Sequence, residues 1–341
     1  MMADPAPDAR ASGGAVPAAV GPYQILGRLG AGGLGEVFRA RDTVHGRTVA
    51  LKVVPAAVSA DPVRAATLKK LAAALSTVSH PGLAELYECG AAESELFLAA
   101  EYVPGQTLAE VTAGRGLHPR RATEIALEIA DALAALHAAG LVHGDLRPDN
   151  VVITPKGHAK LIDPALAPFT AGGAIRATAG SRLGGLPASA APVLRYLAPE
   201  QAAGEPADAR ADLFALGSVL HEMLTGESPF DRPTSDEILL AVLQVVPPAA
   251  SSRAPGVPAE LDVIVTRALA KSLARRYPSA AALADDLRAV KSVLDAEAAE
   301  RPTPEPPARA FPRSKAVAGA LLLAAAALVA WWEWGALTAL F

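Results

Sequence analysis

Apolar positions from residue 23 onward follow two different periods along the chain. Five short segments rich in β-branched, aromatic and aliphatic residues are typical of strands: 23–29, 36–41, 49–54, 86–88 and 96–102. One helical segment, about 62–78, interrupts them, and after residue 105 helices predominate. Strands and helices in separate blocks predict an α+β fold with two lobes.

The clearest helix is predicted over residues 119–139. Pro119 lies in its first turn and Gly140 follows its end, which are the usual start and stop signals. Its apolar stripe is formed by Ile125, Ile129, Leu133 and Leu136. This stripe is expected to face the core of the second lobe.

The segments that flank these blocks differ from them in composition. Residues 1–22 are rich in Ala, Pro and Gly without a period, and they predict a disordered leader. Residues 294–315 contain RPTPEPPARAFPRSK, which predicts an exposed, proline-rich linker. The region 23–293 between them is expected to form the globular part.

The C-terminal residues are apolar on every side. Residues 316–332 carry no charge, and a membrane span needs about 20 apolar residues. Tryptophans, which favour the membrane interface, surround Glu333, and Arg309, Arg313 and Lys315 precede the run. We therefore expect a single transmembrane helix over 316–338, in the cell (inner) membrane, with the globular part in the cytoplasm. A helix packed on the globular part, or lying at the interface, is the alternative.

Composition excludes several classes of function. The 31 basic and 35 acidic residues give a net charge of −4, which argues against a nucleic-acid binder held by bulk charge. The single cysteine, Cys89, excludes an internal disulfide and a cysteine-rich zinc site. Apolar residues make up 51% of the chain, which is enough for a sizeable core.

A glycine-rich motif and a lysine follow one another in the first block. Residues 30–37 read GAGGLGEV, and no helix follows them, so a dinucleotide-binding fingerprint is disfavoured. In the next strand, alternation places Ala50 and Lys52 on one face. A lysine in an apolar strand is costly to bury without an anion. The pattern predicts a triphosphate site, with motif positions Gly30, Gly32, Gly35 and Val37.

Oxygen-bearing side chains gather around one predicted hairpin in the second block. They are Asp145, Asn150 and Asp163. Carboxylate and carbonyl oxygens suit magnesium (Mg²⁺), and one acid is then left to orient a hydroxyl. Each residue alone would be an ordinary loop residue. Together with Lys52 and the glycine loop, they predict a site for a phosphate-bearing ligand and Mg²⁺.

These motifs, in this order, resemble those of the bacterial eukaryotic-like serine/threonine protein kinases over about residues 23–293. The resemblance continues through YLAPE at 196–200 and ADLFALG at 211–217, and Arg276 in a later segment is expected to pair with Glu200. It implies a bilobal protein-kinase fold: an N-lobe (23–103) with an antiparallel sheet and one helix, and a mostly helical C-lobe (104–293).

The resemblance also implies roles around ATP and Mg²⁺. Lys52 would hold the α- and β-phosphates, and Asn150 and Asp163 would hold the magnesium ions. Asp145 would accept the proton of the substrate hydroxyl, and Arg147 occupies the place of the catalytic-loop lysine. ATP and unidentified protein substrates are the implied partners, nucleic acid is not expected, and a homodimer stays open.

The adenine site is implied in the same way. Glu101 and Val103 belong to the segment that corresponds to the hinge, with Ala100 as a small residue before it. The base would lie between Val37, Ala50 and Val152.

Several positions depart from the family pattern. Leu71 stands where the family has a helix glutamate, so we expect Lys52 to lack its usual partner and to be mobile. Gly144 replaces an arginine that receives an activating phosphate, and Pro164 and Ala165 replace Phe and Gly. The sequence thus predicts weak phosphate transfer from ATP to protein serine or threonine. The alternatives are a membrane-tethered pseudokinase that uses nucleotide only as a conformational ligand and, because HGDL also resembles aminoglycoside kinases, a small-molecule kinase.

Overall fold

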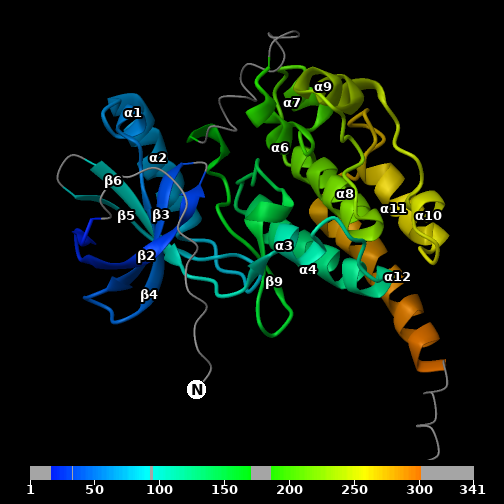
Figure 1. Cartoon of the computed structure of the whole chain (residues 1–341), viewed down its shortest axis with the longest axis horizontal. Coiled ribbons are helices and arrows are strands. Elements are labelled where there is room, and N and C mark those ends of the chain that lie inside the picture. The colour runs from blue at the N-terminus through cyan, green and yellow to red at the C-terminus, as the bar shows by residue number, and fades with distance from the viewer. Residues whose placement is uncertain (1–16, 33, 93–94, 170–185, 301–341) are drawn as a thin grey trace, which may run out of the picture. The chain divides into compact units, whose positions relative to one another are not determined.

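The computed structural model of the chain describes residues 17–32, 34–92, 95–169 and 186–300 (Figure 1). Two units follow one another along the chain, Met1–Leu294 and Asp295–Phe341. The elements below belong to the first unit, apart from residues 295–300, which end helix α12 (Ala280–Glu300).

The first unit begins with a sheet of six antiparallel strands in the order β1-β2-β3-β4-β6-β5. The five segments predicted as strands are all found in it. Two helices, α1 (Ala56–Ser59) and α2 (Pro62–Leu75), lie between β4 and β5. The strands are β1 (Ala19–Val20), β2 (Tyr23–Gly32), β3 (Gly35–Asp42), β4 (Thr48–Val53), β5 (Leu86–Ala92) and β6 (Glu95–Glu101).

The second half of the unit is mostly helical and carries a small sheet in the order β7-β8-β9 (Figure 1). Its strands are β7 (Gln106–Thr107), β8 (Val151–Ile153) and β9 (Ala159–Leu161). Its longer helices are α4 (Pro119–Ala138), α8 (Arg210–Thr225), α9 (Ser235–Gln244), α11 (Ala259–Ala268) and α12. Its short helices are α3 (Leu108–Thr112), η1 (Pro148–Asn150), η2 (Ala167–Phe169), η3 (Ala188–Ala190), α6 (Ala191–Leu194), α7 (Pro199–Ala202) and α10 (Ala250–Arg253). The predicted α+β organisation in two lobes is confirmed.

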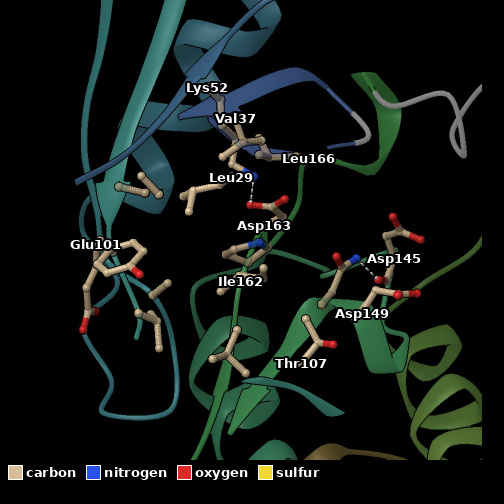
Figure 2. A pocket seen from close by; sticks show the side chains of 18 of the residues that line it. Leu29, Val37, Lys52, Glu101, Thr107, Asp145, Asp149, Ile162, Asp163 and Leu166 are labelled. Atoms are coloured by element: carbon tan, nitrogen blue, oxygen red, sulfur yellow. Dashed lines mark hydrogen bonds and ion pairs between the residues drawn. The ribbon is translucent and has the colours of Figure 1, made fainter. Parts of the chain in front are cut away.

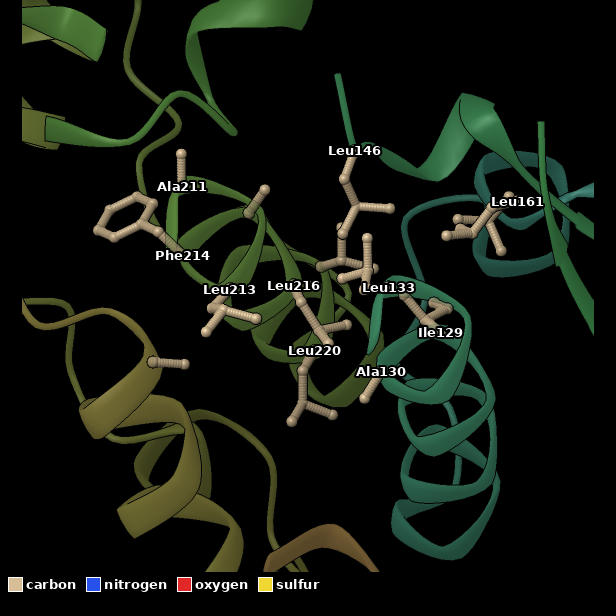
Figure 3. Close-up of a cluster of buried hydrophobic side chains, with 14 of the residues drawn as sticks. Ile129, Ala130, Leu133, Leu146, Leu161, Ala211, Leu213, Phe214, Leu216 and Leu220 are labelled. Carbon is tan, nitrogen blue, oxygen red and sulfur yellow. The ribbon is translucent and has the colours of Figure 1, made fainter. Parts of the chain in front are cut away.

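The core of the helical half lies between α4 and α8 (Figure 3). The predicted apolar stripe of α4 is buried. Nearly every residue of α8 is buried as well, including the polar residues Asp212, Ser218 and His221. Leu146 and Leu161 extend this core toward the loops that carry the site.

The two halves are joined by backbone hydrogen bonds as well as by packing. Leu83 forms a parallel bridge with Leu161 on β9. The N–H of Ala84 donates to the carbonyl of Leu161 at 2.8 Å, and the N–H of Leu161 donates to the carbonyl of Gly82 at 2.8 Å. The segment after α2 therefore anchors the first sheet to β9, which leads directly into Asp163.

The predicted end of the N-terminal leader, expected over 1–22, is wrong. Ala19 and Val20 form β1 and pair with Gln24 and Tyr23 of β2. Gly21, at a φ of 52°, allows the tight turn between the two strands. Residues 1–16 lie outside the described residues.

The C-terminal linker also differs from the expectation over 294–315. Residues 294–300 are helical because they read LDAEAAE, rich in strong helix formers, and the first proline comes at position 302. The rest of the linker and the transmembrane helix expected over 316–338 lie outside the described residues. Among the residues that are described, no helix has both the length and the apolar character needed to span a membrane.

Candidate active site

A cavity of about 670 Å³ lies between β2, β3 and β4 on one side and the β8–β9 hairpin on the other (Figure 2). Its size falls in the range of small-molecule sites. Most residues predicted for the site line it: Gly30, Val37, Ala50, Lys52, Glu101, Val103, Asp145, Arg147, Asn150, Val152 and Asp163.

One predicted glycine, Gly35, is not part of the cavity wall. It pairs with Gly32 at the tip of the β2–β3 hairpin. A Cβ on Gly35 would lie 2.3 Å from the carbonyl oxygen of Val53, and the φ of Gly35 is 112°. Gly35 is thus required by the close approach of β3 to β4.

Lys52 has a defined ion-pair partner. It lies on β4 opposite Val37 and Leu98, and it is only 6% exposed. Its Nζ contacts Oδ1 of Asp163, as the dashed line in Figure 2 indicates. The helix glutamate is absent, as expected, but Lys52 is not left without an ion-pair partner. A buried ammonium requires an anion, and Asp163 supplies it where the helix offers Leu71.

The backbone at Asp163 is unusual for residues with a side chain. Asp163 has a φ of 61° and Ala165 a φ of 60°, one on each side of Pro164. This left-handed conformation is uncommon for non-glycine residues, although Asp adopts it more readily than most. The N–H of Ala165 donates to the carbonyl of His143 at 3.1 Å. The turn directs the carboxylate of Asp163 toward Lys52.

The loop that carries Asp145 is held by Asp212, whose role the sequence reasoning missed. Asp212 is buried on α8. Its Oδ2 accepts the N–H of His143 and its Oδ1 the N–H of Gly144, both at 2.8 Å. The ring of His137 on α4 lies 2.8 Å from Oδ2. The motif ADLFALG was the available signal, because an acid at the start of a buried helix needs partners.

Asp145 and Asn150 are held within one loop. The side-chain amide of Asn150 donates to the carbonyl of Asp145 at 2.7 Å, and both residues are buried. Arg147 lies beside them, with its Nη1 2.9 Å from Oδ2 of Asp149 and its Nε 3.8 Å from Oδ1 of Asp145. Asp149 was not predicted for the site, but it lines the cavity.

The donor set fits a magnesium ion that arrives with phosphates. Among the described residues, no group of three or more His, Cys, Asp and Glu side chains is placed to hold a metal. Mg²⁺ typically uses one or two protein oxygens together with substrate phosphates and water. Asp163 and Asn150, which both line the cavity, suit that arrangement.

Glu101, predicted as part of the hinge segment, lines the cavity, and its carboxylate has partners outside it. The carboxylate pairs with Lys160 and accepts the N–H of Glu85 at 3.3 Å. The N–H of Glu101 itself donates to the carbonyl of Glu85 at 2.8 Å. The neighbouring residues Tyr102 and Val103 also line the cavity.

The apolar walls of the cavity agree with the prediction and extend it. Val37 and Ala50 come from the first sheet, and Val152 comes from β8. Ile162, which sequence reasoning missed, lies in the segment between β9 and Asp163 (Figure 2). The alternation of side chains after the buried Leu161 was the signal that points to it.

Outside the cavity, the predicted pair between Glu200 and Arg276 is confirmed. Nη1 of Arg276 lies 2.7 Å from Oε1 of Glu200, and Nη2 lies 3.0 Å from Oε2. The same guanidinium donates to the carbonyls of Arg210 and Ala270. This bidentate arrangement fully partners a buried charge.

Comparison with known proteins gives the same assignment. The family model described as "Protein kinase domain" matches residues 23–303. Serine/threonine-protein kinase PrkC of Bacillus subtilis is 35% identical over 81% of this chain and 41% of its own length. Serine/threonine-protein kinase PknH of Mycobacterium tuberculosis is 36% identical over 77% of this chain and 41% of its own. The chain thus spans about two fifths of these relatives.

A solved structure is similar as well. The crystal structure of the Mycobacterium tuberculosis PknI kinase domain has a TM-score of 0.61 and 27% identity, and the match covers 82% of this chain and 99% of that one. The chain belongs to the protein kinase family and carries a serine/threonine kinase domain of the bacterial eukaryotic-like type.

Proposed function

We propose that this domain binds ATP with Mg²⁺ in the cavity and slowly transfers the γ-phosphate to serine or threonine hydroxyls of protein substrates. The observation that carries the proposal is the convergence of Lys52, Asp145, Asn150 and Asp163 on one cavity. These residues come from β4 and from two separate segments of the second lobe.

The residues divide the work by their chemistry. Val37 and Ala50 would cover one face of the adenine and Val152 the other, with the backbone of the segment from Glu101 to Val103 at its edge. Lys52 would bind the phosphates, and Asn150 and Asp163 would hold the metal, which neutralises charge as it develops on the phosphates. Gly30 leaves open space where a Cβ would stand, so phosphates can approach the backbone there.

The transfer step uses Asp145. The hydroxyl oxygen of the substrate forms a bond to the γ-phosphorus, and the bond from that phosphorus to the β–γ bridging oxygen breaks. The hydroxyl proton passes to the carboxylate of Asp145, and ADP and a phosphoester are the products. Arg147, close to Asp145, would stabilise charge on the transferred group.

Slow transfer follows from the way Lys52 is held. Asp163 serves both as its ion-pair partner and as a metal ligand, whereas Leu71 offers Lys52 no charge. Because the carboxylate of Asp163 must serve both Lys52 and the metal ion, the phosphates of ATP should be less well aligned. Imperfect alignment of the reacting groups lowers the rate of transfer. The same observation favours a second candidate function, a pseudokinase that binds nucleotide as a conformational ligand. A small-molecule kinase is disfavoured because the Glu200–Arg276 pair is present.

Labelled phosphate transfer by the full chain, compared with Asp145→Asn, tests the proposal. We expect slow transfer to the chain itself or to a generic protein, and at least 100-fold less in Asp145→Asn, since general acid–base catalysis contributes about 10²–10⁴-fold. Mg²⁺·ATP should also raise the melting temperature, and Asp163→Ala should abolish the metal-dependent part. Nucleotide binding without transfer would favour the pseudokinase. An unchanged melting curve at millimolar ATP would overturn both.

We further propose that residues 316–338 anchor the kinase domain on the cytoplasmic side of the cell (inner) membrane. The support is the apolar run, its tryptophans and the basic residues before it. The full chain should resist extraction by alkaline carbonate, and its release would contradict the anchor. Light scattering of the purified chain tests whether it forms a homodimer.

A further inference from the structure

Lys160 and Glu101 form an ion pair that the transfer chemistry does not use. Lys160 lies on β9 and Glu101 ends β6, 59 residues earlier. The ammonium contacts both carboxylate oxygens, and the two side chains are only 17% and 28% exposed. This partial shielding from water makes the pair stronger than an ordinary surface ion pair.

The register of the strands places this pair at one side of the base slot. On the first sheet, Ala50 of β4 is opposite Ala100, which immediately precedes Glu101. On the second sheet, Val152 of β8 is opposite Lys160. Ala50 and Val152 are the residues proposed to contact opposite faces of the base. The ion pair therefore joins the strand pair that carries one wall of the slot to the strand pair that carries the other.

β9 is the fixed partner in this relationship. Leu161 is fully buried and exchanges backbone hydrogen bonds with Gly82 and Ala84. The N–H of Ala159 donates to Oε2 of Glu128 on α4 at 2.6 Å. On the other side, Glu101 is the last residue of β6, where it is paired with Val49 and donates its N–H to the carbonyl of Glu85, and residues 102–104, which follow it, have no regular secondary structure. The ion pair therefore ties β9 to the last ordered point of the first sheet before this irregular segment.

We infer that Lys160 is a positioning residue for the nucleotide base, acting through Glu101 to set the spacing between the two walls of the slot. The inference rests on the proposed binding of ATP in this cavity. Lys160 does not line the cavity, so it touches no part of the nucleotide. Its loss should weaken recognition of the base and leave recognition of the phosphates unchanged.

Calorimetric titration of the full chain with adenosine, Mg²⁺·ATP and Mg²⁺·tripolyphosphate separates the two effects. Lys160→Met should weaken adenosine and ATP by the same factor, about three- to tenfold, as expected for loss of about 1 kcal/mol. Tripolyphosphate affinity should not change. Lys160→Arg should restore base binding because it keeps the charge. Lys156→Met is the matched control, since it removes an exposed lysine from the turn of the same hairpin.

A second variant, at the other member of the ion pair, separates loss of the pair from misfolding of Lys160→Met. Glu101→Gln keeps the shape of the side chain and should reproduce the loss, and the double variant should be no weaker than either single one. Equal adenosine affinity in Lys160→Met and the wild-type chain would overturn the inference, as would an equal loss for tripolyphosphate. If the wild-type chain bound no adenosine or ATP, the proposed function itself would fail.

Discussion

The ammonium of Lys52 and the carboxylate of Asp163 meet across the cavity, although 111 residues separate them in the chain. The contact ties β4 of the first lobe to the segment that follows β9 in the second. The carboxylate of Asp163 is thus both the ion-pair partner of Lys52 and a proposed ligand of the metal ion. A substitution at Asp163 should therefore affect both the stability of the fold and the rate of phosphate transfer.

Removing the charge of Asp163 should destabilise the fold more than removing the charge of Lys52. Lys52 is almost fully buried, so Asp163→Asn leaves an uncompensated ammonium inside the protein. We expect Asp163→Asn to lower the free energy of unfolding by about 1–3 kcal/mol, and Lys52→Met by less. Urea denaturation of both single variants and the double variant measures this. Additive effects would mean that the two charges do not interact.

Giving Lys52 a second acid should raise the rate of phosphate transfer. Leu71 is half-buried on α2 and packs against the core, one turn before Leu75, which lines the cavity. Leu71→Glu should increase initial rates by at most about tenfold, because one preorganised group is typically worth ~10²–10³ and Lys52 already has a partner. Adding Pro164→Phe should increase them further.

Leu71→Gln is the control for this prediction, since glutamine has the same shape as glutamate but carries no charge. Rates of labelled transfer should separate the two variants. Robust transfer by the wild-type chain, near 1 s⁻¹ as in ordinary kinases, together with its loss in Leu71→Glu, would contradict the prediction.

Gly144 should tolerate alanine less well than another glycine of similar conformation. Gly144 and Gly140 have φ values of 75° and 73°. A Cβ on Gly144 would lie 3.0 Å from the Cβ of Ala167, whereas nothing lies within 4 Å at Gly140. Both alanine variants incur about 1–2 kcal/mol of backbone strain, and only Gly144→Ala should also displace η2. Its free energy of unfolding should fall further, and equal losses would mean that the contact with Ala167 relaxes freely.

The Glu200–Arg276 pair should be among the most sensitive positions of the second lobe. The Arg276 side chain is 0% exposed and that of Glu200 5%. Glu200→Gln leaves a buried guanidinium without its counter-charge, so the free energy of unfolding should fall by about 3–5 kcal/mol. Glu205→Gln, the same change at an exposed neighbour, should cost under about 0.5 kcal/mol. Similar melting curves for the two variants would contradict the prediction.

Lys271 should make stability depend on pH in the alkaline range. Burial, and then the nearby charge of Arg276, lower the pKa of Lys271 from 10.5 to about 7. Between these values the unfolded chain binds a proton that the folded chain does not. The contribution of Lys271 to the free energy of unfolding should therefore rise with pH from about 7 to 10.5. Below pH 7 this contribution should be constant, because Lys271 is protonated in both the folded and the unfolded state.

The comparison of wild type with Lys271→Met isolates this contribution from other titrating groups. The difference in unfolding free energy between the two proteins should change with pH across the window. A constant difference would mean that Lys271 stays charged, held by the carbonyl of Val242 and by the rings of Phe214 and Phe230 at 5.1 and 4.1 Å.

Local patterns of the sequence predict much of the architecture. Strand-like and helical periods in separate blocks predict two lobes, and the stripe from Ile125 to Leu136 is buried as its spacing requires. Alternation along β4 places Ala50 and Lys52 on the cavity side and Leu51 in the core. Periods and motif spacings suffice here because they depend on neighbours along the chain.

The resemblance to a family implied the Glu200–Arg276 pair, but only the tertiary structure decided which of the other charges meet. The sequence offers Lys52 many acids, and packing brings Asp163 to it. The carboxylate of Glu101 pairs with Lys160 on β9, and Asp212 on α8 holds the loop that carries Asp145. An ion pair forms only where folding brings two charges within a few ångströms and excludes water between them. That distance depends on how distant elements pack against each other, and no local pattern of residues contains it.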